Sequence, residues 1–430
     1  MKQVKIAMIG AGSFVFSMSL LYDMIVESQL PGSKLVLMDV NLASAERMAK
    51  IARIMAAESG VSMSIEATSD LTAALKDADY VTTSVAAGLI KRYDTDREII
   101  LKYGIKEPVS ECGGVGGLSY TLRSVQLVMD IVREMERVCP NAWLLNVSNP
   151  LPRVMTAVAR HSSIRGLGFC SVAQGGVDGY LNVSSWLHRH AEELDVVSAG
   201  LNHFSWLLSV RDRSTGEDLL AEANEAVRRG AWEWQPRTPG WLEQYGSVPL
   251  AGDSHTGEYL PFPDEIKVSE HGGYHGSDEE RVERLRRLEE AANGRYPWQE
   301  MLENRSWERP GLVIHALATN TSLKQNMLNI PNRGYIRNLP DEIIVEVPAN
   351  ITNGKVEGCV VGDLPEPVRQ LCEQVSRVHE CSVRAAVTGD MDLVDEAIDI
   401  DPAITQKAAA KEAIRELIRV NADVLPLFKH

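Results

Sequence analysis

The chain has 430 residues, of which 44% are hydrophobic, enough for one large folded unit or two smaller ones. Its 44 basic and 59 acidic residues give a formal net charge of −15, which argues against a nucleic-acid-binding surface, because such a surface gathers Lys and Arg. No stretch reaches the ~20 apolar residues of a bilayer-spanning helix. We therefore expect a folded protein that binds neither nucleic acid nor membrane.

The N-terminal residues lead directly into an apolar run, with no basic region and no cleavage site, so the protein is predicted to be cytoplasmic. The six cysteines include no C-x-x-C pair, and a disulfide framework is not expected. A cysteine with a special role would be a thiolate ligand or a nucleophile. The alternative for each is a small buried side chain.

Strand-length apolar runs alternate with helical patterns along the first half of the chain. Strands are predicted over residues 4–9, 34–38, 64–67, 80–84, 142–146 and 166–170, and helices over residues 43–58 and 121–138. This alternation predicts an α/β fold with a Rossmann-type, doubly wound parallel sheet.

The pattern changes near residue 195, so we predict a first domain over residues 1–195 and a second, mixed α+β domain over 196–430. In the second, strands are predicted over residues 195–209 and 342–347, and helices over 277–290, 365–388 and 404–421. The last two helices are expected to close the second domain or to form a subunit contact. They favour a homo-oligomer, a dimer or tetramer.

A glycine turn follows the first predicted strand and precedes a helix. Gly10 and Gly12 let the backbone turn tightly and bring N–H groups close to a pyrophosphate. The third glycine of the usual dinucleotide fingerprint is replaced by Val15, so a plain tight turn is the alternative. Asp39 ends the second predicted strand, where a carboxylate binds ribose hydroxyls and repels the extra phosphate of NADP. This favours NAD, and a helix N-cap is the alternative for Asp39.

Short motifs occur in one order along nearly the whole chain, and together they resemble glycoside hydrolase family 4. They are Ile9-Gly10-Ala11-Gly12-Ser13-Phe14, Ala78-Asp79-Tyr80-Val81, Glu111-Cys112-Gly113-Gly114, Asn146-Val147-Ser148-Asn149-Pro150, Gly168-Phe169-Cys170, Gly200-Leu201-Asn202-His203, Glu258-Tyr259, Asn332-Arg333-Gly334-Tyr335-Ile336-Arg337-Asn338-Leu339-Pro340 and Thr388-Gly389-Asp390.

The resemblance implies a glycosidase that uses NAD within each turnover, an exception to the two-carboxylate scheme of most glycosidases. In that family NAD takes a hydride from C3 of the sugar, a base removes the C2 proton, and the aglycone is eliminated. Water then adds and the steps reverse. A divalent metal such as manganese normally polarises the C3 and C2 oxygens.

The resemblance also assigns roles to individual residues. Ser13 and Phe14 would lie at the cofactor, and Asn149 would contact both the cofactor and the substrate. Cys170 and His203 would be the metal ligands. Family members commonly carry His, Asp or Asn after the cysteine, whereas this chain has Ser171, which is a poor general acid. The acid role and the metal dependence are therefore both in question.

Two residues are predicted to be catalytic. Glu111 is the candidate general acid, because a closed site can raise the pKa of a carboxyl, and a helix-entry acid is the alternative. Tyr259 aligns approximately with the family's base, and an ordinary packed tyrosine is the alternative. His255, on the same loop, is a predicted substrate contact or a second candidate base.

Arg92 and Arg333 lie in or beside matched segments and are candidate contacts for an anionic group on the sugar, with surface arginine as the alternative. The predicted substrate is an anionic α-glycoside, a sulfoquinovoside first and an α-galacturonide or α-glucoside next, because the residue after Cys170 suggests a divergent branch. Two other functions stay open: a dehydrogenase of sugars or hydroxy acids that releases NADH, and a non-catalytic NAD-binding sensor.

Overall fold

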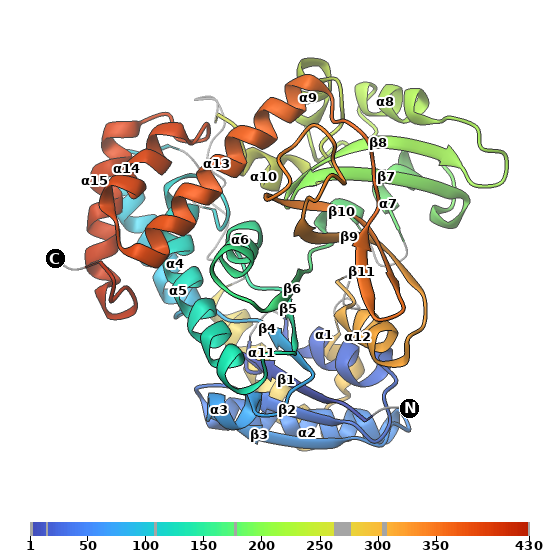
Figure 1. The fold of residues 1–430 in the computed structure, drawn as a ribbon, viewed down its shortest axis with the longest axis vertical. Coiled ribbons are helices and arrows are strands. Elements are labelled where there is room, and N and C mark those ends of the chain that lie inside the picture. The colour runs from blue at the N-terminus through green and yellow to red at the C-terminus, as the bar shows by residue number, and fades with distance from the viewer. Residues whose placement is uncertain are drawn as a thin grey trace.

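The computed structural model describes residues 3–13, 16–106, 110–175, 179–261, 277–302 and 308–428. Its first half holds six parallel strands, β1 (Lys5–Ile9), β2 (Lys34–Met38), β3 (Ser64–Thr68), β4 (Tyr80–Thr83), β5 (Trp143–Asn146) and β6 (Arg165–Gly168). They lie in the order β3-β2-β1-β4-β5-β6, which is the Rossmann arrangement (Figure 1). The predicted fold class is confirmed.

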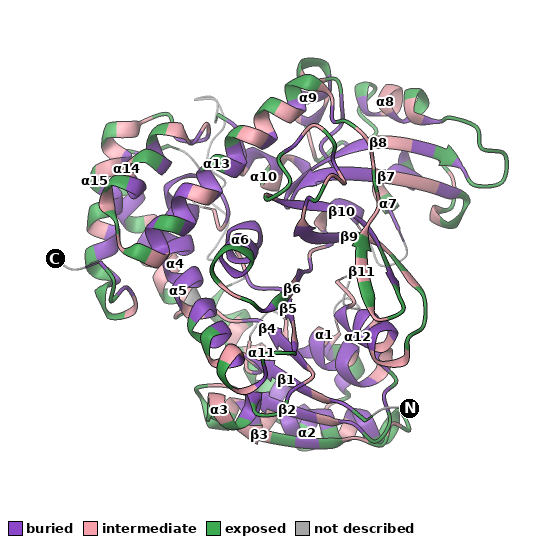
Figure 2. Ribbon diagram, in the orientation of Figure 1, coloured by how far each residue is buried: buried purple, intermediate pink, exposed green. Residues whose placement is uncertain are grey.

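The inner strands β1, β2, β4 and β5 are buried on both faces, as a parallel sheet requires, whereas the edge strand β3 is partly exposed (Figure 2). Along β1, Ile6 and Met8 enter one hydrophobic core, and Ala7 and Ile9 enter the other, because successive side chains point to opposite faces. The helices of this half are α1 (Ser17–Tyr22) with a π-helical turn η1 (Asp23–Glu27), α2 (Leu42–Glu58), α3 (Leu71–Leu75), α4 (Leu89–Lys102), α5 (Gly114–Val138) and α6 (Leu151–His161).

The second half contributes β7 (Leu194–Leu201), β8 (Phe204–Asp212), β9 (Leu323–Pro331), β10 (Ile344–Thr352) and β11 (Lys355–Gly358). These strands extend the first sheet instead of forming one of their own. β9 joins β6 at the pair Gly168–Asn329, and β10 joins β7 at Glu346–Gly200, giving an 11-stranded sheet. The predicted boundary at residue 195 therefore falls inside β7, within a continuous sheet.

One strand prediction for the second half needs correction. The single strand expected over residues 195–209 is a hairpin, since β7 and β8 turn at Asn202 and His203. In addition, β9 and β11 were not predicted. The turn is fixed by Glu346, a buried carboxylate that accepts hydrogen bonds from Asn202 Nδ2 at 2.9 Å and Ser205 Oγ at 2.6 Å.

The other helices are α7 (Leu181–Trp186), α8 (Leu220–Arg228), α9 (Thr238–Tyr245), α10 (Gly252–Thr256), α11 (Asp278–Ala292), α12 (Pro310–Thr319), α13 (Glu366–Thr388), α14 (Met391–Ile400) and α15 (Lys407–Val420), with short 3₁₀ turns η2 (Val172–Gln174), η3 (Ala191–Glu193), η4 (Gly257–Tyr259), η5 (Trp298–Met301) and η6 (Ala422–Val424). The C-terminal helices cover the first half of the chain: α13 packs on α5 and α6, and α15 packs on α4 and α5 (Figure 1). Their apolar faces are thus used within the chain, and the homo-oligomer stays a prediction.

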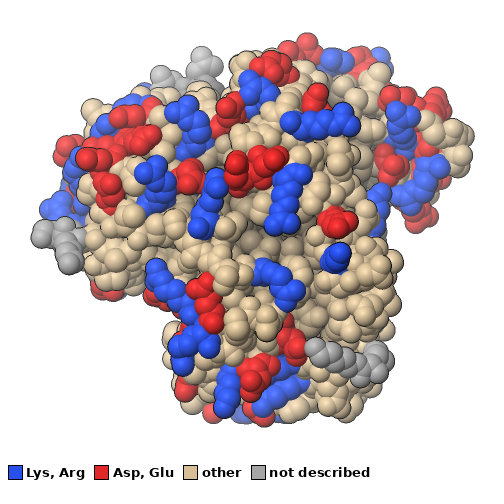
Figure 3. Space-filling model, viewed as in Figure 1, with Lys and Arg blue, Asp and Glu red and all other residues tan. Residues whose placement is uncertain are grey.

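None of the described helices combines the length and the apolar character that a membrane span requires. On the face shown in Figure 3, Lys and Arg side chains are interspersed with Asp and Glu. This face therefore carries both signs of charge, and the whole sequence has 59 acidic and 44 basic residues.

A buried ion pair joins α4 to α5. Arg123 donates to both carboxylate oxygens of Asp96, at 3.1 and 2.7 Å, and both side chains are only 3% exposed. We expect Arg123→Met to lower the free energy of unfolding by about 3–5 kcal/mol, because Asp96 would be left as an uncompensated buried charge. Urea unfolding followed by circular dichroism measures this.

The matched control is Arg133→Met on the same helix, whose partner Asp130 is 71% exposed. We expect that variant to lose less than about 1 kcal/mol, since water screens an exposed pair. Equal losses in the two variants would show that the Arg123 pair adds nothing beyond a surface pair.

Candidate functional site

A cavity of about 780 Å³ opens at the carboxyl ends of the parallel strands. In a doubly wound sheet this edge, at the switch point between β1 and β4, is where ligands bind. Segments directly after five of the parallel strands line the cavity. They are Gly10, Gly12 and Ser13 after β1, Asp39 after β2, residues 84–88 after β4, residues 147–149 after β5, and Phe169 and Cys170 after β6.

The glycine turn has the tight geometry that the sequence predicted. Gly10 has φ +83°, and a Cβ on it would lie 2.2 Å from the carbonyl oxygen of Ser84, so only glycine fits. The N–H groups of Gly10 and Ala11 both donate to the Met38 carbonyl, at 2.9 and 3.0 Å. The turn is therefore held against β2 and leaves room for a ligand beside it.

Asp39 lies at the end of β2 and lines the cavity, as expected for a ribose-binding carboxylate. It accepts hydrogen bonds from the N–H groups of Gly12 and Asn41, each at 2.9 Å. The alternative reading as a helix N-cap does not hold, because the cap of α2 is Asn41, whose side chain accepts from Ser44. Ser13 also lines the cavity, and Phe14 lies outside the described residues.

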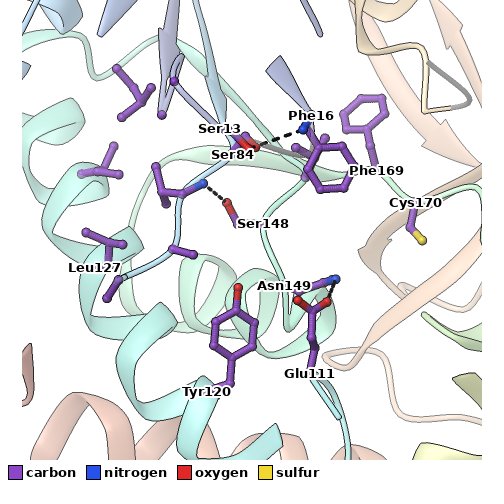
Figure 4. A pocket seen from close by; sticks show the side chains of 18 of the residues that line it. Ser13, Phe16, Ser84, Glu111, Tyr120, Leu127, Ser148, Asn149, Phe169 and Cys170 are labelled. Atoms are coloured by element: carbon purple, nitrogen blue, oxygen red, sulfur yellow. Dashed lines mark hydrogen bonds between the residues drawn. The ribbon is translucent and has the colours of Figure 1, made fainter. Parts of the chain in front are cut away.

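The side chains of Glu111 and Asn149 both line the cavity and point toward one another (Figure 4). Asn149 Nδ2 donates to Glu111 Oε2 at 2.7 Å. Enclosure by protein raises the pKa of Glu111 to about 7, although the hydrogen bond from Asn149 lowers it. A carboxyl with this pKa is partly protonated at neutral pH and is therefore suited to act as a general acid.

Glu258, on η4, is a second carboxyl in the same cavity, and sequence reasoning gave it no role. Burial, and then the charge of Glu111, raise the pKa of Glu258 to about 8. Its Oε2 accepts the N–H of Cys112 at 3.2 Å. The only sequence signal was its place beside Tyr259 in the Glu258-Tyr259 motif.

Two histidines line the cavity beside these carboxyls. The rings of His203 and His255 meet edge to face, with their centroids 4.5 Å apart. Burial lowers the pKa of both imidazoles, so both are neutral at pH 7. His203 is only 5% exposed, and its Nδ1 has no hydrogen-bond partner among the described residues. A neutral, unpartnered imidazole nitrogen is a suitable metal donor.

Cys170 lines the cavity after β6, as predicted for a metal ligand. Burial, and then the charges of Glu346 and Glu308, raise its thiol pKa. Ser171 is buried and donates to Glu308 Oε1 at 3.3 Å, so it holds another cavity carboxylate instead of facing the cavity itself. Sequence reasoning missed Glu308, which no motif marked.

Tyr259 is 2% exposed and is absent from the described residues that line the cavity, so it lies behind them. Its hydroxyl lies beside the Cys112 thiol, and burial raises the pKa of the phenol well above its usual value. In this environment Tyr259 holds its proton. The predicted role as a base thus needs a change in its surroundings, whereas His255 already faces the cavity.

The structure does not bring Arg92 or Arg333 to the described cavity lining. The Arg92 guanidinium donates to Asn421 Oδ1 at 2.7 Å and to Asp423 Oδ1 at 3.1 Å, so the C-terminal segment occupies it. Arg333 is exposed in the turn after β9, at φ +46°. Their predicted contact with the substrate has no support from this geometry.

The chain has a Rossmann sheet with a cavity at its switch point, and carboxyl groups and neutral histidines line that cavity. These features are typical of dinucleotide-dependent enzymes. The family model described as family 4 glycosyl hydrolase matches residues 5–183, and that for the C-terminal domain of the family matches residues 198–404. The chain therefore belongs to glycosyl hydrolase family 4, and the predicted family and glycosidase class are confirmed.

Relatives and solved structures match over the full length. The chain is 29% identical to an α-glucosidase of Erwinia rhapontici, over 96% of this chain and 97% of the relative. It is 30% identical to an α-galactosidase of Rhizobium meliloti (strain 1021), over 100% and 91%. A 6-phospho-α-glucosidase from gut microorganisms, solved in complex with NAD and Mn²⁺, is similar in fold, with a TM-score of 0.82 at 23% identity and full coverage of both chains.

Proposed function

We propose that this chain hydrolyses glycosides with a bound NAD, by transient oxidation of the sugar at C3. The observation that supports this proposal most is that one cavity is lined by two sets of residues, one suited to a dinucleotide and one suited to acid–base chemistry. At one end are the glycine turn and Asp39, and at the other are Glu111, Glu258 and His255. A dinucleotide along the first end would present its nicotinamide to a sugar at the second.

The residues at the first end fit NAD. Gly10, Gly12 and Ser13 line the cavity at the turn, where a pyrophosphate can approach the backbone closely, and Asp39 suits ribose hydroxyls. Further along, Val40, Leu71 and Ile131 supply an apolar wall for a flat base. Bound NAD supplies a hydride acceptor for C3, which acidifies the C2 proton.

At the second end Glu111 donates a proton to the leaving group, because its raised pKa keeps part of the enzyme in the protonated form at neutral pH. Asn149, hydrogen-bonded to Glu111, orients that carboxyl. A base takes the C2 proton. Tyr259 is the base that the resemblance implies, and His255 is the alternative that already lines the cavity.

The residues also fit a divalent cation. His203 offers an unpartnered buried nitrogen, and a Cys170 thiolate is a soft donor on the same cavity. Such a cation would supply a Lewis acid at the sugar oxygens. Manganese is the ion that the family resemblance implies.

The charge of the cavity lining bears on which of the predicted sugars is the substrate. The described residues that line the cavity include the carboxyls of Asp39, Glu111, Asp130, Glu258 and Glu308, and no Lys or Arg. This lining favours a neutral α-glucoside or α-galactoside over an anionic sugar, because no described cation offsets a sulfonate or carboxylate. A sulfoquinovoside stays a prediction.

Hydrolysis of aryl α-glycosides with neutral, uronic, 6-sulfo and 6-phospho sugars tests the proposal, with protein stripped of NAD and then reloaded, and with and without Mn²⁺. We expect one glycoside to be cleaved only when NAD is present, without accumulation of NADH. In D₂O the released sugar should carry deuterium at C2. Stoichiometric NADH with an oxidised sugar would instead support a net dehydrogenase.

The choice of cofactor gives a separate prediction. We expect Asp39→Ser to weaken NAD binding by about 1.5–3 kcal/mol, roughly 10- to 100-fold, because charged hydrogen bonds to the ribose are lost. NADP should lose less, since repulsion of its phosphate is also removed. Titration of both cofactors against protein fluorescence measures the two affinities.

Asp70→Asn is the control, because Asp70 follows β3, the next strand of the sheet, and caps α3 outside the cavity lining. It should leave both affinities unchanged. An unchanged NAD affinity in Asp39→Ser would remove Asp39 from the cofactor site.

A further inference from the structure

One buried acid connects the two segments that carry Cys170 and His203. Glu346 lies on β10 and is only 2% exposed. It is absent from the described residues that line the cavity, so it lies behind them. Sequence reasoning predicted a strand at this position and gave the acid no role.

Glu346 belongs to a row of directly paired residues that crosses β6, β9, β10 and β7. In this order, the row consists of Gly168, Asn329, Glu346 and Gly200. Cys170 follows the first member of the row by two residues, and His203 follows the last member by three. The row thus connects the two strands that lead into the proposed cation ligands, although two other strands separate them in the sheet.

The carboxylate of Glu346 forms hydrogen bonds to both sides of this row. Its Oε2 accepts from Asn329 Nδ2 on β9 at 3.0 Å and from Asn202 Nδ2 at 2.9 Å. Its Oε1 accepts from Ser205 Oγ at 2.6 Å. Asn202 and Ser205 lie on either side of His203 in the β7–β8 hairpin, and all three donors are fully buried. Water therefore does not compete for these bonds, and one carboxylate holds both the turn and β9.

The same contacts extend to the cysteine. The Asn202 side chain lies beside the Cys170 thiol, which the charge of Glu346 also reaches. The described groups that act on the Glu346 carboxyl are its three neutral donors, with no cation among them. A buried carboxylate without a cation is costly. A divalent ion in the cavity would supply the positive charge that these described groups do not.

We infer that Glu346 is a positioning residue for the divalent cation, because it holds the end of β6 and the β7–β8 turn where Cys170 and His203 can bind one ion together. The inference rests on the cation site of the proposed function and gives that site no new ligand. Outer-shell partners of this kind orient the ligands of a metal, and loss of one costs about 10- to 100-fold in metal affinity.

The affinity of the full chain for Mn²⁺, measured from the electron paramagnetic resonance signal of the free ion, tests this role without turnover. We expect Glu346→Val to lower the affinity by about 10- to 100-fold, because it removes the acceptor of all three hydrogen bonds. Native affinity in Glu346→Val overturns the inference. A native chain without Mn²⁺ binding that depends on Cys170 overturns it together with the cation site.

Glu346→Gln is the conservative variant and should lose less than about tenfold in Mn²⁺ affinity. Its amide oxygen can accept from both asparagines, while its NH₂ group faces the Ser205 hydroxyl, which can also accept a hydrogen bond. Gln therefore keeps the connection between the segments and removes the charge. An equal loss in Glu346→Gln and Glu346→Val would mean that the carboxylate acts by its charge alone, which overturns the positioning role.

Asn329→Leu is the second variant and does not depend on the folding of Glu346→Val. It removes only the hydrogen bond on the β9 side and leaves Glu346 with its other two donors. We expect the Mn²⁺ affinity to fall by about tenfold, the lower end for an outer-shell partner. NAD affinity should stay native, because Asp39 and the glycine turn lie at the other end of the cavity. Native Mn²⁺ affinity in Asn329→Leu would overturn the inference.

Arg123→Met is the control for stability. Its ion pair with Asp96 joins α4 to α5 and does not involve the row of paired residues. This variant should unfold more easily than the native chain and still bind Mn²⁺ with native affinity. A loss of Mn²⁺ affinity in Arg123→Met as large as that in Glu346→Val would assign both losses to stability and overturn the positioning role.

The two proposals fail separately. NAD-dependent hydrolysis, together with native Mn²⁺ affinity in Glu346→Val, would exclude only the positioning role. The expected losses of Mn²⁺ affinity, together with hydrolysis that does not depend on NAD, would exclude only the proposed function.

Discussion

Replacing Glu111 with Gln is expected to lower kcat by about 10²- to 10⁴-fold on an alkyl glycoside, the usual contribution of a positioned general acid. Gln has the same shape and can still contact Asn149, but it has no acidic proton to donate. The measurement is steady-state hydrolysis with NAD bound. KM should change little, because the amide keeps the shape and the hydrogen-bonding atoms of the site.

The protonation of Glu111 predicts how the activity of the native enzyme changes with pH. Burial raises the pKa of Glu111 to about 7, so the protonated form required of an acid is dominant below that pH and is lost as the pH rises through it. The native enzyme should therefore lose activity above pH ~7. Glu111→Gln should lack this alkaline limb, since its residual activity does not depend on that proton.

The leaving group serves as the internal control. A nitrophenolate needs little protonation, so Glu111→Gln should retain much more of its native rate on a nitrophenyl glycoside than on an alkyl glycoside. Equal losses on both substrates, with the alkaline limb unchanged, would limit Glu111 to orienting the substrate. The acid would then be sought in Glu258, the other cavity carboxyl with a raised pKa.

Local sequence patterns were enough to predict the Rossmann half. Strands β1, β2 and β5 are short, mainly apolar runs whose side chains are buried on both faces of the sheet, so the sequence pattern and the observed burial agree there. The glycine turn and Asp39 were found because they directly follow strands. Positions at strand ends can be read from the sequence once the strands are known.

The second half depends on long-range pairing. β9 is rich in polar residues, and its Asn329 side chain points to the buried Glu346, so its burial pattern follows from partners far along the chain. Glu258 joins Cys112 and Glu111 only because η4 meets the start of α5. Arg92 was a candidate for substrate binding, and its partner Asp423 lies more than 300 residues away in sequence.

Replacing Gly113 with Ala is also expected to lower kcat strongly. A Cβ at this position would lie 1.7 Å from the carbonyl oxygen and 2.5 Å from the carbonyl carbon of Glu258, both backbone atoms that cannot rotate away. Gly113→Ala must therefore move η4 away from α5. We expect kcat to fall by at least about 100-fold, as for a displacement of about 1 Å at a reacting group. Steady-state kinetics with NAD bound measures the loss.

Gly114→Ala is the matched control one residue along. Gly114 has φ +62°, which strains an alanine, but a Cβ there meets no atom within 4 Å. The expected cost in stability is about 1–3 kcal/mol for either variant, from overpacking in the first and from backbone strain in the second. Only Gly113→Ala should lose most of its activity, because only there does the added carbon displace Glu258 and the neighbouring Tyr259. Similar kinetics in the two variants would mean that the active site tolerates a shift of η4, and that the close approach of α5 to Glu258 serves the fold and not the chemistry.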